Sequence, residues 1–252
     1  MQIAGRGRIV VWEGASLWVL AAQRDGAGTD FHAHHAIQIT ISLDGEFVIR
    51  TPDHGVYGPV AAVAADAQHI FAATGTTAFL FVEPESPAGR AIASRLFANS
   101  SLAGIDAAPL LPIMAALREC FAASSPATAL IEIGRAILTA IAGEQAPVLP
   151  HPRVQAMIDF IDAHLDGPLS LNAAADCAHL SPSRARHLFA ADTGLPFKTY
   201  VLWQRLKRAV ELYAAGHSLT AVAHEAGFAD SAHLSRTFRK TFGIPASLLE
   251  VA

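Results

Sequence analysis

The chain has 252 residues, of which 52% are hydrophobic and 16% charged, so it is long enough for two domains with buried cores. Its formal net charge of −4 divides unevenly: residues 1–150 hold 8 Lys and Arg against 13 Asp and Glu, whereas residues 151–252 hold 10 against 9. This balance excludes a generally basic nucleic-acid binder, so any DNA contact must come from a local basic face.

The sequence shows no sign of membrane insertion or of a cysteine-based site. It has no run of about eighteen apolar residues, and its N-terminus lacks a long apolar segment with a cleavage site. Cys120 and Cys177 are the two cysteines, and they form no CxxC pair. We therefore expect a cytoplasmic protein without a membrane partner, a structural disulfide or a cysteine-rich zinc site.

Residues 1–85 carry the pattern of short β-strands. The strand-like runs are rich in β-branched and aromatic residues, and Gly, Asp and Pro residues separate them. They cover residues 9–12, 16–20, 37–43, 47–49 and 78–82. This pattern predicts a small β-barrel or sandwich.

A histidine-rich stretch lies inside this region. Its order is His32-x-His34, three residues, Gln38, six residues and Gly45, and His69 follows farther along. The spacing resembles the first motif of the cupin fold, with Gln38 where metal-binding cupins have Glu. His69 stands where the second cupin motif supplies its third histidine, although the proline and asparagine of that motif are missing. The resemblance implies a cupin-like barrel with a site inside it.

The three histidines allow two interpretations of that site. On a strand, His32 and His34 would point to the same side, towards the barrel interior. With His69 they would offer three imidazole nitrogens to Zn²⁺, Ni²⁺, Cu²⁺ or Fe²⁺ and leave positions open for water or a ligand. Alternatively, the pocket holds a small-molecule effector without a metal, and the histidines hydrogen-bond to it or to water. His35 alternates with these residues and is expected to face outward.

Residues 86–143 have apolar side chains at helical spacing and are predicted to form a helical segment. Its last helix, within residues 126–143, is apolar around most of its circumference, which indicates burial on more than one side. Residues 144–152 follow, with three prolines in nine positions. We expect them to form an extended linker.

Residues 153–252 contain two helix-turn-helix patterns, at about 170–194 and 219–243. In the first, Ser170 and Ser181 are suitable N-caps and Gly194 a helix end. In the second, Gly227 ends one helix and Asp230 caps the next. This duplication is more specific than either copy alone.

A long helix is predicted at residues 196–216, between the two patterns. A rigid connecting helix sets the spacing of two reading helices. Successive major-groove segments on one side of DNA lie about 34 Å apart, so one chain could read both.

The second pattern resembles the C-terminal motif of the AraC/XylS family of bacterial transcription regulators. The matching residues are Gly227-Phe228, Leu234, Phe238-Arg239-Lys240 and Gly243-Ile244-Pro245, with Ile244 where the family usually has Ser or Thr. The resemblance implies an α+β two-domain protein, with an N-terminal cupin-like β-barrel and helical segment. Its C-terminal domain would be all-α, with two helix-turn-helix motifs joined by a linker helix.

The resemblance also implies which side chains contact DNA. Residues that fall at base-reading positions are Ser183, Arg186, His187, Ser231, Ala232, His233 and Arg236. Arg184, Arg205, Arg239 and Lys240 are predicted to contact phosphates, which position a protein without specifying sequence. For any single one of them, the alternative is a solvated surface group.

The function expected from this resemblance is sequence-specific, effector-responsive transcription regulation without enzymatic activity. The expected partners are double-stranded promoter DNA, a small-molecule or metal effector held by His32, His34, Gln38 and His69, and RNA polymerase. In the family, helices after the cupin form the dimer contact, so residues 107–143 are predicted to support a homodimer. The alternative for these helices is packing on the barrel.

Two other function classes fit the sequence. One is a metal-dependent cupin enzyme fused to a DNA-binding domain, against which Gln38 and the incomplete second motif both count. The other is a regulator that acts constitutively, without a ligand.

Overall fold

The structure is a computed structural model that describes residues 7–21, 27–143 and 150–245. Contacts divide the chain into two compact units, residues 1–147 with 238–252 and residues 148–237. Residues 144–149, which make up most of the predicted linker, lie outside the described residues. No helix among the described residues has the length and apolar character needed to cross a membrane.

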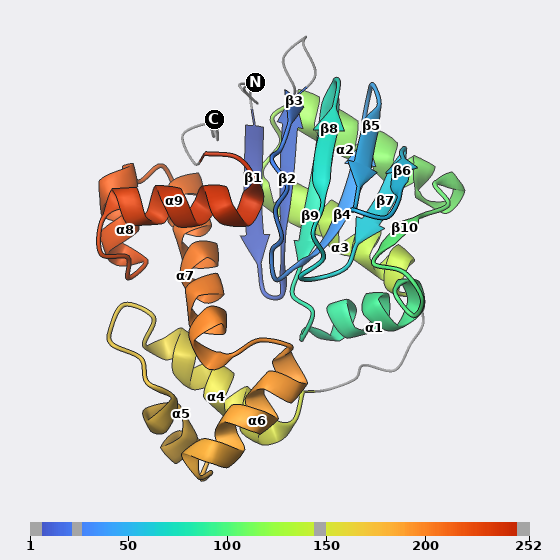
Figure 1. The fold of residues 1–252 in the computed structure, drawn as a ribbon. Helices are drawn as coiled ribbons and strands as arrows, with labels where there is room; N and C mark the ends of the chain where they lie inside the picture. Colours follow the sequence, from blue (N-terminus) through green and yellow to red (C-terminus); the bar gives the residue numbers. More distant parts are fainter. Residues whose placement is uncertain (1–6, 22–26, 144–149, 246–252) are drawn as a thin grey trace. The chain divides into compact units, whose positions relative to one another are not determined.

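The first unit is built on two antiparallel sheets (Figure 1). In the described residues, a six-stranded sheet has the order β1-β2-β9-β4-β7-β10 and a four-stranded sheet the order β3-β8-β5-β6. The strands are β1 (Gly7–Trp12), β2 (Ala15–Ala21), β3 (Ala27–Gly28), β4 (Ile37–Ser42), β5 (Phe47–Arg50), β6 (Gly55–Tyr57), β7 (Val60–Val63), β8 (Ile70–Ala73), β9 (Thr76–Val82) and β10 (Leu102–Gly104). The five strand-like runs of the sequence correspond to β1, β2, β4, β5 and β9, so these predictions are confirmed.

The six-stranded sheet is covered on both faces, and β4 shows this most clearly. Successive side chains of a strand point to opposite faces. Ile37, Ile39 and Ile41 belong to the core that the sheet shares with the helices, whereas the intervening Gln38 and Thr40 are buried on the other face. That other face meets the second sheet, because Phe71 of β8 lies 4.9 Å from Phe79 of β9 between ring centroids. The polar side chains of β4 therefore point into the space between the two sheets.

Helices α2 and α3 lie along the six-stranded sheet, and α1 packs against α3 at the end of the strands (Figure 1). The bounds of α1, α2 and α3 are Pro87–Leu96, Leu111–Ala122 and Ala127–Ala142, and a short 3₁₀ turn, η1 (Ala108–Leu110), precedes α2. Leu130, Ile137 and Ile141 of α3 are buried in the core of the unit, which satisfies much of the apolar circumference predicted for this helix. One part of this segment differs from the helical prediction: Leu102–Gly104 form β10, which pairs with β7. Three residues are too short a run to show either periodicity.

The second unit is helical and has a core of its own. Its helices are α4 (Pro152–Ala163), α5 (Leu171–Cys177), α6 (Pro182–Thr193), α7 (Phe197–Ala214), α8 (Leu219–Glu225) and the first part of α9 (Ser231–Phe242). Met157 and Ile161 of α4, Phe189 of α6 and Tyr200 of α7 are among the buried residues that form this core. The predicted helices of both helix-turn-helix patterns and the long helix between them are present.

The predicted caps explain where these helices begin and end. The Ser170 and Ser181 hydroxyls accept hydrogen bonds from the backbone N–H groups of Ala173 and Arg184, at 3.2 and 3.4 Å. Asp230 caps α9 by accepting from the N–H of His233 at 2.6 Å. Each of these bonds satisfies an amide that has no partner within its own helix.

Gly227 ends α8 in a left-handed conformation that glycine adopts more readily than any other residue. Its φ is +76°, and a Cβ there would lie 2.7 Å from Leu165 O and 2.8 Å from Arg205 Nε. Gly216 has a similar φ of +87°, but among the residues that the structure describes no non-neighbouring atom lies within 4 Å of its Cβ position. We expect Gly216→Ala to destabilise the chain by about 1 kcal/mol through the backbone alone.

Gly227→Ala is expected to cost more, about 2 kcal/mol or above, because steric overlap adds to the same backbone penalty. Urea unfolding of the two variants beside the unaltered chain measures the difference. Equal losses at the two positions would show that the close approach at Gly227 carries no energetic weight.

Candidate functional site

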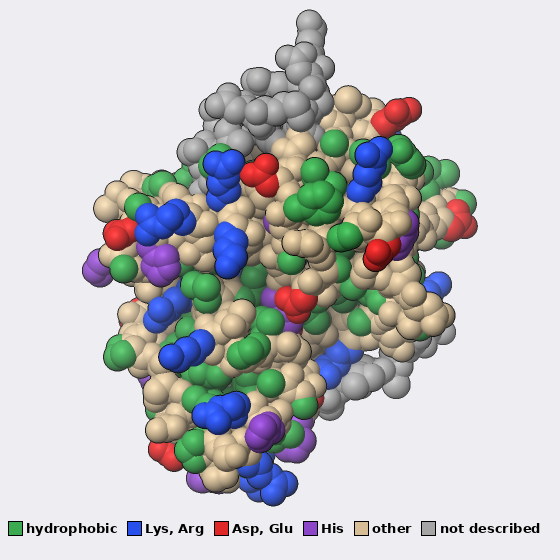
Figure 2. Space-filling view, in the orientation of Figure 1, with side chains coloured by type: hydrophobic (Ala, Val, Ile, Leu, Met, Phe, Trp, Pro, Cys, Tyr) green, Lys and Arg blue, Asp and Glu red, His purple; other side chains and the backbone are tan. Residues whose placement is uncertain are grey.

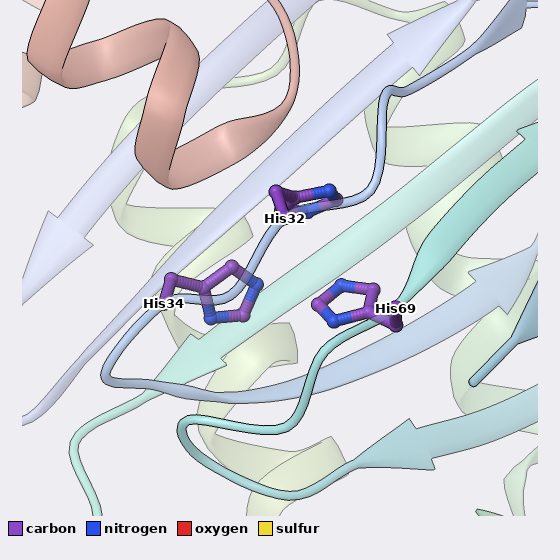
Figure 3. A group of neighbouring side chains, drawn as sticks. All are labelled: His32, His34 and His69. Atoms are coloured by element: carbon purple, nitrogen blue, oxygen red, sulfur yellow. The ribbon is translucent and has the colours of Figure 1, made fainter. Parts of the chain in front are cut away.

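Three histidines come together in the first unit, with their rings turned toward one another (Figure 3). His32 and His34 come from the segment before β4, and His69 from the segment before β8. His32 and His69 exchange two backbone hydrogen bonds, of 3.0 and 2.9 Å, so they are direct neighbours across an isolated antiparallel bridge. The ring centroids lie 4.2 to 5.6 Å apart.

This arrangement agrees with the prediction in outcome but not in local structure. The segment that carries His32 and His34 is not a regular strand, apart from the bridge at His32. His34 reaches the cluster from an irregular segment that its backbone hydrogen bond to Asp66 holds in place. Strand alternation was therefore the wrong reason for expecting the two side chains to meet.

The three rings share one hydrogen-bonding pattern. Each places Nδ1 against a backbone carbonyl oxygen two residues away: His32 at 2.8 Å from Asp30 O, His34 at 3.1 Å from Ala36 O, and His69 at 2.9 Å from Ala67 O. A neutral imidazole has one N–H group, so donation from Nδ1 leaves Nε2 with a free lone pair. Holding one nitrogen in this way is how proteins orient histidine ligands of metals.

Burial keeps these rings neutral. Their exposed fractions are 5% for His32, 3% for His34 and 0% for His69. Burial is the main cause that lowers the pKa of all three, and the neighbouring imidazoles add to it for His34 and His69; together these causes take the pKa of His69 to about 4. At neutral pH the cluster is therefore uncharged and its nitrogens can act as ligands.

Gln38 and Thr40 extend the cluster along β4. The side-chain amide of Gln38 bridges His34 Nε2, at 3.1 Å from its Oε1, and the Thr40 hydroxyl, at 3.0 Å from its Nε2. If His34 donates through Nδ1, its Nε2 is an acceptor, and the amide must then present its NH₂ group to it. Position 38 therefore brings a neutral amide, and not a carboxylate, within reach of the site.

The donor set fits a transition metal. Among the described residues, His32, His34 and His69 form a group whose ligand atoms all lie within 4.8 Å of one another. His69 Nε2 is buried and has no hydrogen-bond partner within the described part of the chain, which is costly for a polar atom unless something binds it. Nitrogen ligands on a tetrahedral zinc are roughly 3.4 Å apart, so small side-chain rotations would close the set.

Aromatic side chains surround the cluster. Phe81 packs edge-on against His34, with 5.2 Å between ring centroids, and against Trp18 at 4.9 Å. Phe79 and Phe71 continue the aromatic wall. The polar nitrogens therefore face an otherwise apolar interior.

His35 is not on the surface, contrary to the prediction from alternation. Its side chain is 4% exposed and lies 2.8 Å from an Asp66 carboxylate oxygen and 3.6 Å from one of Glu85. Burial alone would lower the pKa of His35, but the hydrogen bonds to Asp66 and Glu85 and the charges of these carboxylates outweigh it and raise the pKa to about 9. The prediction failed because the segment is irregular and strand alternation does not apply to it.

Sequence reasoning also missed Thr40, Asp66 and Glu85. Thr40 carried a usable signal, since it follows Gln38 at the two-residue period of β4. Asp66 and Glu85 lie about 30 and 50 positions from His35 and follow no motif, so only the fold brings them to it.

The predicted base-reading residues lie on α6 and α9. Ser183, Arg186 and His187 are exposed on α6, opposite the buried Ala185 and Phe189. On α9, Ala232 and Arg236 are exposed, Ser231 and His233 are partly exposed, and Leu234 and Phe238 are buried. Each helix thus has one packed side and one side that carries the predicted base-reading residues.

The predicted phosphate-binding residues differ in their surroundings. Arg184, Arg239 and Lys240 are exposed. Arg205 is half-buried, and its guanidinium donates to Leu165 O at 3.2 Å and to Gly167 O at 2.8 Å, which ties the loop after α4 to α7. Figure 2 shows Lys and Arg side chains spread over the C-terminal helices on this face, which agrees with a local basic surface in a chain of negative net charge.

Comparisons with known proteins concern mainly this C-terminal region. Residues 174–249 match the family described as a helix-turn-helix domain. The regulatory protein PocR of Salmonella typhimurium (strain LT2) is 31% identical to this chain over 97 residues. These residues cover 38% of this chain and 32% of PocR. The transcriptional activator RhrA of Rhizobium meliloti (strain 1021) is 32% identical to this chain over 108 residues. These residues cover 41% of this chain and 34% of RhrA. The chain spans about a third of the length of these relatives.

A likeness of fold extends over both parts of the chain. The structure of unsaturated fatty acid bound wild-type ToxT from Vibrio cholerae strain SCE256 has a TM-score of 0.54 and 9% identity. The likeness covers 96% of this chain and 98% of that one. The chain therefore carries the DNA-binding helix-turn-helix domain of AraC/XylS-family transcription regulators, and this domain follows an N-terminal β-sheet domain with a ToxT-like fold.

Proposed function

We propose that this chain is an effector-responsive transcription regulator without enzymatic activity, whose effector site is the histidine cluster. In this proposal, residues 1–85 form a cupin-like sensor, residues 86–143 a helical packing and dimerisation segment, residues 144–152 a linker and residues 153–252 the DNA-binding domain. An effector acts by favouring one of two states of the chain, so it must bind them with different affinities.

The observation that carries the proposal is the shared orientation of His32, His34 and His69. All three place Nδ1 against a backbone carbonyl in a buried, neutral cluster, which leaves Nε2 of His32 and His69 available to a ligand. Nε2 of His34 lies 3.1 Å from Gln38 Oε1 and would exchange this contact for the ligand. Imidazole nitrogens suit Zn²⁺, Ni²⁺, Cu²⁺ and Fe²⁺. A bound metal would supply a positive charge with open coordination positions, and Gln38 is near enough to orient a molecule that occupies one of them.

A metal-free effector site is the second candidate, and the aromatic wall favours it. Trp18, Phe71, Phe79 and Phe81 offer an apolar surface beside neutral hydrogen-bonding groups, which is the usual make-up of a small-molecule site. The ToxT structure named above holds an unsaturated fatty acid. By analogy, this site would take an amphipathic organic molecule whose polar end reaches the histidines.

For DNA binding, the proposal assigns base contacts to Ser183, Arg186, His187, Ser231, Ala232, His233 and Arg236. Arg184 and Lys240 would contact phosphates. Arg205 already holds two carbonyls of its own unit, and Arg239 pairs with the Asp30 carboxylate at 3.1 Å, so each of these two would have to share its guanidinium. RNA polymerase is the expected protein partner. Leu111 of α2 is 58% exposed and lies in the segment proposed for homodimerisation.

The test measures metal content and DNA binding on the same preparations. The full chain, purified without chelator, and its His32→Ala/His34→Ala variant are analysed for bound metal and titrated with Zn²⁺. Each is then footprinted, with and without metal, on promoter fragments. We expect about one metal per chain, lost in the variant, and a 5- to 150-fold effect of the metal on DNA affinity, the usual range of allosteric coupling.

His54→Ala is the matched control, because His54 is exposed in the same unit and lies outside the cluster. If the double substitution leaves the metal content unchanged, the proposal that these histidines bind a metal is wrong. If metabolite ligands then stabilise the chain in thermal-shift assays and this effect needs His32 and His34, the metal-free site is supported. Absence of any protected DNA sequence would contradict the regulatory function itself.

A further inference from the structure

His35, Asp66 and Glu85 form a partly buried polar group beside the histidine cluster, and none of them belongs to the set that faces the effector position. The His35 ring lies between the two carboxylates, 2.8 Å from Asp66 Oδ2 at Nδ1 and 3.6 Å from Glu85 Oε2 at Nε2. His35 and Glu85 are buried, whereas the Asp66 side chain is 49% exposed. The group joins three segments: the one before β4, the one before β8 and the one after β9.

The backbone ties the same segments together. The N–H of Asp66 donates to His34 O at 2.9 Å, so Asp66 contacts both His34 and His35. The next residue, Ala67, supplies the carbonyl oxygen that accepts from His69 Nδ1 at 2.9 Å. Asp66 is therefore bonded to one side of the cluster and adjacent in sequence to the group that orients the other side.

The conformation of Asp66 supports a positioning role. Its φ is +60°, in the left-handed region that few residues other than glycine adopt, although Asp tolerates it better than most. Strained backbone of this kind persists where the surroundings hold it, and it gathers at functional sites. Two hydrogen bonds, one from the backbone N–H and one to the side chain, hold Asp66 in this conformation.

Net stabilisation alone is a weak reason for such a group. Buried ion pairs are often no more stabilising than apolar residues of similar volume, whereas their directional bonds set geometry. We infer that His35, Asp66 and Glu85 are a brace that holds His34 and His69 in the relative positions that effector binding requires. The inference rests on the proposed function of the histidine cluster, and it makes these three positioning residues and not ligands.

Asp66→Ala removes the brace, and Asp44→Ala provides a matched control. Asp44 also joins two turns of the same unit, since its Oδ1 accepts from the N–H of Thr76 at 2.6 Å. Asp44 follows β4, whereas Asp66 contacts His34 and His35, which precede that strand. The six residues of β4 therefore separate the two aspartates by about 20 Å along the strand. Asp66→Asn keeps a hydrogen-bond acceptor for His35 and is the conservative substitution expected to restore function.

Two readouts are needed. The first is metal affinity by competition with a chelator, together with the visible absorption spectrum of the Co²⁺-loaded chain, which reports ligand geometry. We expect Asp66→Ala to lower Zn²⁺ affinity by 10- to 100-fold, the usual effect of removing a group that orients a ligand, and to alter the Co²⁺ spectrum. Asp44→Ala is expected to change neither, and Asp66→Asn to recover most of the affinity.

The second readout needs no metal. Amide hydrogen exchange of the metal-free chain should become faster at Asp66 and His69 in Asp66→Ala, and at Thr76 in Asp44→Ala. If the unaltered chain binds no metal but this local exchange pattern appears, the metal proposal fails and the brace stands. Should Asp66→Ala keep its affinity, spectrum and exchange rates, the brace is refuted. If Asp66→Ala does not fold, His35→Gln undergoes the same measurements, with the same outcomes for and against.

Discussion

Arg186→Ala and Arg236→Ala should each weaken binding to the specific DNA site by about 5- to 150-fold, and the double substitution should weaken it by the product of the two factors. Arg is the usual partner of guanine O6 and N7 in the major groove, and a bidentate contact of this kind discriminates by about 1–3 kcal/mol. Both side chains are exposed, one on α6 and one on α9, opposite buried faces that include Phe189 and Phe238. Gel-shift titration of the full chain with specific and scrambled DNA measures the loss.

Two further substitutions show whether the loss concerns base reading. Arg208→Ala removes an exposed arginine of α7 that pairs with Glu211 and lies outside the predicted DNA-contacting set, so it should leave affinity unchanged. Arg184→Ala removes a predicted phosphate contact, so it should weaken specific and scrambled DNA alike and reduce the salt dependence by about one unit of slope. If Arg186→Ala and Arg236→Ala also act equally on both DNAs, the assignment of base reading to them is wrong.

The stability of the chain should have a maximum near pH 6.5, and His35 should set its alkaline side. The pKa of His35 is raised from 6.5 to about 9, so the folded state keeps a proton that the unfolded state loses above pH 6.5. The contribution of His35 is therefore complete below pH 6.5 and declines as the pH rises to about 9. A shift of this size corresponds to roughly 3 kcal/mol.

The acid side has the opposite sign and a different origin. His32, His34 and His69 have lowered pKa values when folded, so the unfolded state takes up protons first as the pH falls below 6.5. Their contribution to stability is present above that pH and is lost towards pH 4, near the folded pKa of His69. Both sides of the profile thus come from one small group of neighbouring histidines.

Urea unfolding of the metal-free chain between pH 4 and 9 tests this profile. His35→Gln should be less stable overall and should lose the decline between pH 6.5 and 9, whereas His54→Gln, at an exposed histidine of the same unit, should keep it. An unaltered slope in His35→Gln would mean that another group titrates in that range.

The C-terminal helices were predictable because their signals are local. Ser170, Ser181 and Asp230 cap helices, and Gly194 and Gly227 end them, through bonds and dihedral angles that involve residues within a few positions. The apolar spacing of α6, α7 and α9 likewise decides which side of each helix is buried. For these elements, order and approximate bounds could be predicted from the sequence, and so could the exposed side of α6. Arg205 of α7, by contrast, is half-buried.

The β-sheet unit was predictable in part. Long strands such as β2 and β9 carry enough alternating residues to be recognised, but β3, β6 and β10 are two or three residues long and become strands only by pairing. The pairing order of the two sheets depends on contacts between residues far apart in the sequence. A local sequence pattern carries no information about such contacts.

The histidine site divides in the same way. Residue types and spacing are enough to single out His32, His34, Gln38 and His69, because a motif records which groups recur at which intervals. The burial of His35, its contacts with Asp66 and Glu85, and the carbonyls that orient each imidazole depend on distant segments meeting. The sequence by itself therefore determined which chemical groups the histidine site can offer and which helices form the C-terminal unit. Tertiary structure alone decided protonation and orientation, because both depend on which atoms surround a ring and not on which residues precede it.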